Sequence, residues 1–218
     1  MGDSVQTSLA ASTGFSGEYR TDQETLPFML YDQEGNRKYL TRKERQAFVE
    51  AARKAPPEIE TFCLTLAYTG ARISEVLALV PLRIDTPARA IIIESLKKRK
   101  RGIYRAVPVP TDLLRRLNDT HDIEKLRCDA EFRGKRIWTW SRTTAWSRVR
   151  SIMILADIPE NRAMPKSLRH AFGVNGIQNG ISLNIVQRWL GHADIATTAI
   201  YADATGDEER ALAERMWR

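Results

Sequence analysis

The spacing of apolar residues between positions 41 and 80 predicts three consecutive helices. The stretch T-R-K-E opens the first helix, because the Thr41 hydroxyl and the Glu44 carboxylate can each accept a hydrogen bond from a free amide of the first turn. Over 58–68, apolar residues recur at i, i+3, i+4, i+7 and i+8, which is the spacing of a helical stripe that faces a core. A glycine turn follows, and a third helix is predicted over 73–80.

The pattern then changes from helical to alternating. Residues 90–96 and 103–109 are rich in β-branched side chains, and the segment K-K-R-K-R-G separates them. We therefore predict an antiparallel hairpin with a cationic tip, next to which a short strand near 83–84 can pair. Helical spacing resumes after the hairpin over about 111–118, 143–156, 166–178, 182–190, 195–202 and 207–217. The predicted fold class is α+β, mainly helical with one small antiparallel sheet.

Residues 1–38 carry scattered polar residues without sustained apolar periodicity. We predict that they form a flexible leader, followed by one folded domain over 39–218.

The net charge of +7, from 34 Lys and Arg against 27 Asp and Glu, favours a partner rich in phosphate. An anionic membrane surface is the competing partner, but no basic amphipathic segment stands out, and no apolar stretch is long enough to cross a bilayer. The two cysteines, Cys63 in an apolar run and Cys128 between charged residues, are expected to be reduced thiols, which favours a cytoplasmic location. Neither ligand spacing for a metal nor a glycine-rich nucleotide loop is evident, so we expect no metal and no cofactor.

Three segments carry candidate chemistry. In L-A-Y-T-G-A-R-I-S-E, a glycine turn presents Arg72 at the start of a helix, where it can fork onto two phosphate oxygens while Glu75 orients it. Alone, this pair is more often an ordinary surface ion pair. In P-K-S-L-R-H, residues Lys166, Arg169 and His170 stand near the beginning of another helix.

The third segment is W-L-G-H-A-D-I-A-T-T-A-I-Y, residues 189–201. Gly191 is expected to end the preceding helix, His192 stands at the break, and Tyr201 follows on a short helix of its own. Taken singly, such a histidine is more often a helix cap and such a tyrosine a packing residue.

Taken together and in this order, the three segments resemble the motifs of the tyrosine recombinase family, which includes phage integrases and chromosome-dimer resolvases. The family pattern T-G-x-R-x-x-E stands here with Arg72 and Glu75. The pattern H-x-L-R-H stands as K-S-L-R-H, and L-G-H followed by T-T and a tyrosine is complete. The resemblance covers about residues 41–210.

The resemblance implies the catalytic-domain fold of that family and a reaction on double-stranded DNA. Tyr201 would attack a DNA phosphate and form a 3′-phosphotyrosyl link, while Arg72, Arg169 and His192, aided by Lys166, would hold that phosphate. Glu75 and His170 would support these residues. The family exchanges strands as a homotetramer on DNA, and the free chain can be a monomer. The location would then be cytoplasmic and associated with the nucleoid.

The family also keeps a mobile lysine on the hairpin that protonates the leaving 5′ oxygen. Lys97 is our choice for it, and Lys98 and Lys100 are the alternatives. The remaining basic residues of the hairpin are expected to contact the DNA backbone; with the two alternative lysines, this DNA-binding set is Lys98, Arg99, Lys100, Arg101 and Arg105.

Two features depart from the family pattern. Lys166 replaces a histidine; it can still donate to a phosphate oxygen, but it cannot titrate near pH 7. Residues 1–38 are too short and too polar for the N-terminal DNA-binding domain of the relatives, so this chain is either a fragment or a reduced form. The last predicted helix, about 207–217, can dock on its own chain or on a neighbouring copy.

Two other functions remain open. A type IB topoisomerase-like nicking-closing enzyme uses the same nucleophile and phosphate clamp, although the short spacing from His192 to Tyr201 and the lack of a long linker favour a recombinase. A DNA-binding regulator without catalysis would have no chemical reason to keep the tyrosine, both arginines and His192.

Overall fold

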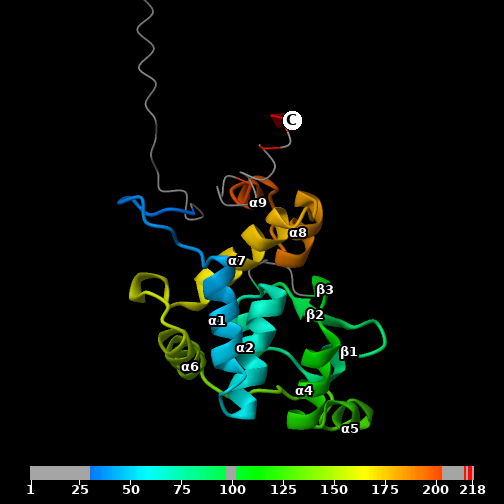
Figure 1. The fold of residues 1–218 in the computed structure, drawn as a ribbon. Helices are drawn as coiled ribbons and strands as arrows, with labels where there is room; N and C mark the ends of the chain where they lie inside the picture. The colour runs from blue at the N-terminus through cyan, green and yellow to red at the C-terminus, as the bar shows by residue number, and fades with distance from the viewer. Residues whose placement is uncertain (1–29, 97–101, 203–213, 215, 218) are drawn as a thin grey trace, which may run out of the picture.

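The structure is a computed structural model that describes residues 30–96, 102–202, 214, 216 and 217 (Figure 1). It confirms the α+β fold class, mainly helical with a small antiparallel sheet. The elements, in chain order, are α1 (Arg42–Ala52), α2 (Pro57–Thr69), α3 (Ile73–Leu77), η1 (Pro81–Arg83), β1 (Ile84–Asp85), β2 (Ala90–Glu94), β3 (Tyr104–Pro108), α4 (Thr111–His121), α5 (Ile123–Cys128), α6 (Arg142–Leu155), η2 (Glu160–Arg162), α7 (Pro165–Gln178), α8 (Leu183–Leu190) and α9 (Ala196–Ala199).

The start of α1 is the predicted capping box. The Glu44 amide donates to Thr41 Oγ1 at 3.2 Å, and the Thr41 amide donates to Glu44 Oε2 at 2.7 Å. The Glu44 carboxylate also accepts from Arg37 Nη2 at 3.1 Å and from Arg162 Nη2 at 2.8 Å. The Glu44 carboxylate therefore links the segment before α1, through Arg37, to the segment before α7, through Arg162.

The sheet has the order β1-β2-β3 with antiparallel neighbours, which confirms the predicted hairpin and the short extra strand. Ile91 of β2 is paired with Ile84 on one side and with Val107 on the other, so the three apolar side chains enter the core together. The basic residues at the tip of the hairpin lie outside the described residues: Lys97, Lys98, Arg99, Lys100 and Arg101.

Helix α2 runs through the centre of the fold and is buried along most of its length. In Figure 1, α1 and α6 lie on one side of it, the sheet and α4 lie on the other, and α7, α8 and α9 lie beyond its C-terminal end. A second, smaller apolar cluster lies apart from the main core and contains Leu30, Tyr39, Val174, Val186, Leu190 and Tyr201.

The predicted leader is too long. Residues 30–38 are part of the fold, because Leu30 is only 4% exposed in the smaller cluster and its carbonyl accepts from the Lys38 amide at 2.7 Å. Arg37 further holds this segment to Glu44. Leu30 belongs to the short apolar run L-P-F-M-L-Y over 26–31, which has no sustained helical or strand periodicity, so the pattern did not reveal this contact. Residues 1–29 and the predicted helix over 207–217, apart from three isolated positions, lie outside the described residues.

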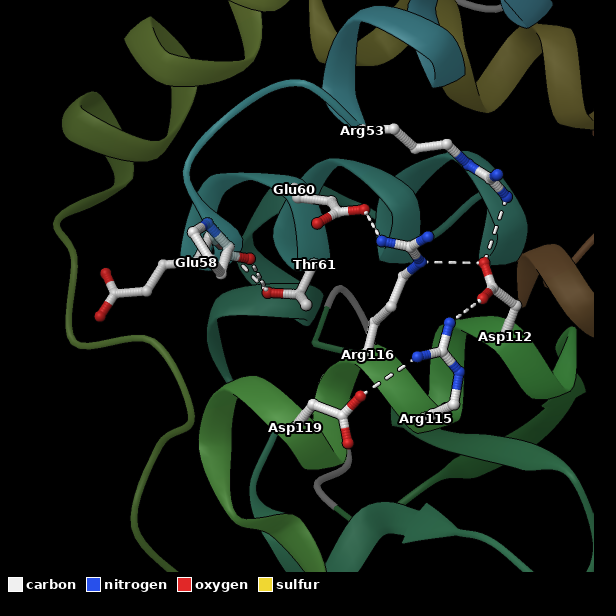
Figure 2. Close-up of polar contacts among 9 residues, drawn as sticks. Arg53, Glu58, Glu60, Thr61, Asp112, Arg115, Arg116 and Asp119 are labelled. Atoms are coloured by element: carbon white, nitrogen blue, oxygen red, sulfur yellow. Dashed lines mark hydrogen bonds and ion pairs between the residues drawn. The ribbon is translucent and has the colours of Figure 1, made fainter.

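Charged side chains join α4 to α2 (Figure 2). Arg116 of α4 donates to Glu60 of α2 and, through Nε at 2.9 Å, to Asp112 on its own helix. Arg53 reaches the Asp112 carboxylate from the end of α1.

Helix α5, which follows α4 in the chain, was not predicted from the sequence. Within the part of the chain that the structure describes, no helix combines the length and the apolar character needed to cross a bilayer.

Candidate active site

Arg72 stands where α2 ends and α3 begins. Gly70 closes α2 with φ of +60°, and Arg72 is the N-cap residue of α3. Arg72 Nη1 donates to Glu75 Oε1 at 2.8 Å, and its amide donates to Glu75 Oε2 at 2.9 Å. The Arg72 side chain is still 23% exposed, whereas that of Glu75 is fully buried. The predicted orientation of the arginine by Glu75 is therefore present, and part of the Arg72 side chain remains exposed.

Glu75 is ionised despite its burial. Burial by itself raises the pKa of Glu75, but the charges and hydrogen bonds of Arg105 and Arg72 outweigh it and hold this pKa below its ordinary value. One carboxylate thus compensates two arginines, and the group keeps a net positive charge.

Arg169 lies in α7 and is almost fully buried. Its Nη1 donates to the Gly70 carbonyl and its Nη2 donates to the Leu190 carbonyl, both at 2.7 Å. These carbonyls stand at the C-terminal ends of α2 and α8, where backbone oxygens lack helical partners and carry partial negative charge. Burial, and after it the positive charge of Arg72, lowers the pKa of Arg169 to about 9. An anion bound beside the two guanidinium groups would relieve this repulsion.

His192 follows the end of α8, where Gly191 has a φ of +68° as the predicted helix terminator. Its Nδ1 lies 2.9 Å from the Thr198 hydroxyl of α9, so this short helix orients the ring. Burial, and then the charges of Arg169 and Arg72, lower the pKa of His192 to about 3. The imidazole is therefore neutral near pH 7.

Tyr201 lies two residues beyond the last residue of α9 and is buried between two histidines. Its hydroxyl lies 3.3 Å from His170 Nδ1, and its ring stacks on His192 with centroids 6.2 Å apart. Burial raises the pKa of Tyr201 above its ordinary value, although Arg169 and Arg72 act in the opposite direction. The phenol thus lies within electrostatic reach of both arginines.

Lys166 is exposed in the first turn of α7, on the His170 side of the site. Burial, followed by the positive charges of Lys166 and Arg169, lowers the pKa of His170 to about 3. Six of the predicted residues are therefore gathered around Tyr201 or its two arginines: Arg72, Glu75, Lys166, Arg169, His170 and His192.

A family model described as the phage integrase family matches residues 38–208. The chain belongs to the phage integrase family. Among its relatives, tyrosine recombinase XerD of Haemophilus influenzae is 39% identical over 88 residues, which are 40% of this chain and 30% of that protein. Tyrosine recombinase XerA of Thermococcus onnurineus is 29% identical over 181 residues, which are 82% of this chain and 62% of that protein. The chain thus spans less than two thirds of the length of these relatives.

Solved structures share this integrase fold. XerA recombinase matches 82% of this chain and 64% of its own with a TM-score of 0.67 and 25% identity. The catalytic domain of bacteriophage HP1 integrase matches 80% of this chain and 92% of its own, with a TM-score of 0.55 and 22% identity. The second match, which covers nearly all of an isolated catalytic domain, agrees with the predicted catalytic-domain fold.

In this integrase fold, the prediction that Arg105 contacts DNA does not agree with its position. Arg105 on β3 points inward, its side chain is only 4% exposed, and it donates to Glu75 Oε2 at 2.6 Å. The strand alternates between exposed and buried positions, and Arg105 occupies a buried one. The basic run ends at Arg101, and the period of two along the predicted strand puts Arg105 on the same face as Val107 and Val109, a signal that could have identified it as facing inward.

Three residues that contact the site were not among its predicted members. Thr198 orients His192, Ser95 contacts Arg105, and Gly173 of α7 leaves room for the Tyr201 ring. A Cβ at position 173 would lie 2.5 Å from Cδ2 of that ring. The motifs T-T and R-H-A-F-G contained Thr198 and Gly173, but their roles depend on contacts across the fold. Among the described residues, no group of three or more His, Cys, Asp or Glu side chains is placed to hold a metal ion.

Proposed function

We propose that this chain is the catalytic part of a site-specific DNA recombinase that cuts and rejoins strands through a covalent link between Tyr201 and a DNA 3′ phosphate. The observation that carries the proposal is the convergence of three segments on one buried phenol. Arg72, Arg169 and His192 all lie within electrostatic reach of one another, and both arginines act on the Tyr201 hydroxyl. Membership of the phage integrase family supports the same reaction.

Arg72, Arg169 and His192 form the proposed phosphate clamp. This clamp suits a phosphodiester in its charged transition state. Arg72 and Arg169 would bind the non-bridging oxygens, and their surplus positive charge would offset the charge that develops as the tyrosine attacks. His192 would add a neutral donor: if its Nδ1 accepts from the Thr198 hydroxyl, the ring proton is on Nε2 and can be donated to phosphate. By analogy with oxyanion-hole donors, the loss of one such donor should cost about 3 kcal/mol, or roughly a hundredfold in rate.

The two proton transfers have separate candidates. Tyr201 must lose its proton as its oxygen bonds to phosphorus; His170 Nδ1 lies 3.3 Å from that oxygen and would accept the proton, because the negative charge of the bound phosphate would raise the pKa of His170 from its low value in the free protein. This would compensate for Lys166, which is not a base near pH 7. The P–O5′ bond then breaks, and Lys97 would give its proton to the leaving oxygen. In the rejoining step, a 5′ hydroxyl of the partner strand would attack the phosphotyrosyl phosphorus and give its proton to Lys97, while Tyr201 would leave and recover a proton from His170.

We further propose that the partner is double-stranded DNA, that the active assembly is a homotetramer on two duplexes, and that the protein is associated with the nucleoid. Solved relatives of the same fold were studied with DNA, such as XerH recombinase bound to its difH substrate, at 19% identity and a TM-score of 0.65. The net charge of +7 agrees with such a partner.

The test is a covalent trap. The chain is incubated with a pool of nicked suicide duplexes of random sequence, and the products are separated in detergent. We expect a protein–DNA band with wild type and none with Tyr201→Phe, which keeps the packed ring but lacks the nucleophile. Sequencing the trapped DNA gives the target site for a two-duplex exchange assay. Covalent trapping without any exchange, together with relaxation of a supercoiled plasmid, would instead support a topoisomerase-like activity.

A further inference from the structure

Among the predicted DNA contacts, only Arg105 lies within the described residues. The fold turns its side chain inward, and its surroundings point to another role. Its guanidinium donates to three separate segments: to Glu75 at 2.6 Å, to the Ser95 hydroxyl at 3.1 Å and, through Nε, to the Trp189 carbonyl at 2.6 Å. A planar guanidinium can hold three acceptors in fixed directions, which a lysine cannot do.

The first segment is the phosphate clamp. Glu75 accepts from Arg105 with the same oxygen that accepts from the Arg72 amide, and its other oxygen holds the Arg72 guanidinium. Arg105 therefore fixes the carboxylate that fixes Arg72. Because Glu75 is fully buried, removal of Arg105 would leave its carboxylate with a single cationic partner and with only Arg72 to fix its orientation.

The second segment is the end of α8. Trp189 and Leu190 are consecutive, and their carbonyls accept from Arg105 and Arg169 respectively. Gly191 packs against the Arg105 side chain: a Cβ at position 191 would lie 3.0 Å from Arg105 Nη1. Glycine at this position thus ends the helix and also leaves space for Arg105. The two arginines together hold the backbone that leads into His192.

The third segment is the hairpin. Ser95 closes the end of β2, where its amide donates to the Ile103 carbonyl at 2.9 Å, and it stands two residues before Lys97. The contact from Arg105 to the Ser95 hydroxyl therefore anchors the base of the loop that would carry the proton donor.

We propose that Arg105 is a positioning residue that couples the phosphate clamp to the base of the hairpin at Ser95, so that its loss disturbs both Arg72 and the strand end that precedes Lys97. The inference rests on the proposed function and adds a residue to it. Arg105 does not touch DNA in this account. By analogy with residues that orient metal ligands, its loss should lower the cleavage rate by about 10- to 100-fold.

The experiment compares Arg105→Met with Arg115→Met, a control that removes the same charge from an exposed position on α4. DNA binding is measured against salt concentration, and cleavage is measured in single turnover on the trapped target sequence. We expect both variants to keep the same salt dependence of binding and only Arg105→Met to cleave slowly. A salt slope that falls by about one unit in Arg105→Met alone would indicate a direct phosphate contact and overturn the proposal. Unchanged cleavage would overturn it too.

A second substrate tests the link to the hairpin. In a duplex with sulfur in place of the bridging 5′ oxygen, the leaving group is a thiolate, which needs no proton donor because its pKa is far below that of an alcohol. We expect the deficit of Arg105→Met to be several-fold smaller on this substrate, whereas a merely structural defect would slow both substrates equally and overturn the coupling. If Arg105→Met does not fold, as judged by circular dichroism, Ser95→Ala provides the same comparison with a smaller deficit.

The two proposals fail in different ways. Absence of a covalent band with wild type would count against the recombinase function, while the binding comparison still tests whether Arg105 contacts phosphate. An active wild type with an equally active Arg105→Met would count against the positioning role alone.

Discussion

Glu75→Gln removes the negative charge that two arginines share, while the side chain keeps its size. In the wild type, the Glu75 carboxylate lies 2.8 Å from Arg72 Nη1 and 2.6 Å from Arg105 Nη2, and the Arg105 side chain is nearly fully buried. Removing one partner of a buried pair costs about 3–5 kcal/mol, because the other charge stays in a poorly solvated place. For a domain of this length, we expect the melting temperature to fall on the order of 10 °C.

The assay is urea and thermal unfolding followed by circular dichroism, with Glu131→Gln as the matched control. Glu131 also forms an ion pair, with Lys135 at 2.7 Å, but both side chains are exposed, so its loss should cost less than about 1 kcal/mol. Equal effects of the two substitutions would refute the reasoning that burial makes the Glu75 pairs important for stability.

The stability difference between wild type and Glu75→Gln should also depend on pH. The pKa of Glu75 is held below its ordinary value of 4.5 in the folded state, so its contribution to stability is present above about pH 4.5 and is lost as the pH falls. The stability difference between wild type and Glu75→Gln should therefore be largest near neutral pH and should narrow in acid. A difference that widens on acidification would contradict the direction of this shift.

Two further substitutions test packing and the network of Figure 2. In Gly173→Ala, the new Cβ would lie 2.5 Å from the Tyr201 ring, so we expect a loss of about 1–3 kcal/mol in unfolding free energy and much less covalent product; Gly134→Ala, with no atom within 4 Å, should behave as wild type. In Arg116→Met, Glu60 loses its cationic partner, and urea unfolding should show a larger loss than in Arg115→Met, whose exposed pairs contribute less than about 1 kcal/mol.

The sequence by itself determined the features that depend on neighbouring residues. The capping box at Thr41, the helix end at Gly191 and the hairpin between 90 and 109 follow from hydrogen bonds and turn preferences within a few positions, and the structure has all of them. The order and spacing of the three motifs likewise identified the family and the residues gathered around Tyr201.

Only the tertiary structure decided which side chains face inward and which residues they meet. Arg105 reaches the Trp189 carbonyl 84 positions away; strand alternation puts it on the face of Val107, but only the fold shows which acceptors it meets there. Leu30 joined the fold because a cluster built from α7 and α8 covers it, and Gly173 matters because the Tyr201 ring lies against it. Such contacts arise from packing between distant segments, and local sequence preferences carry no information about that packing.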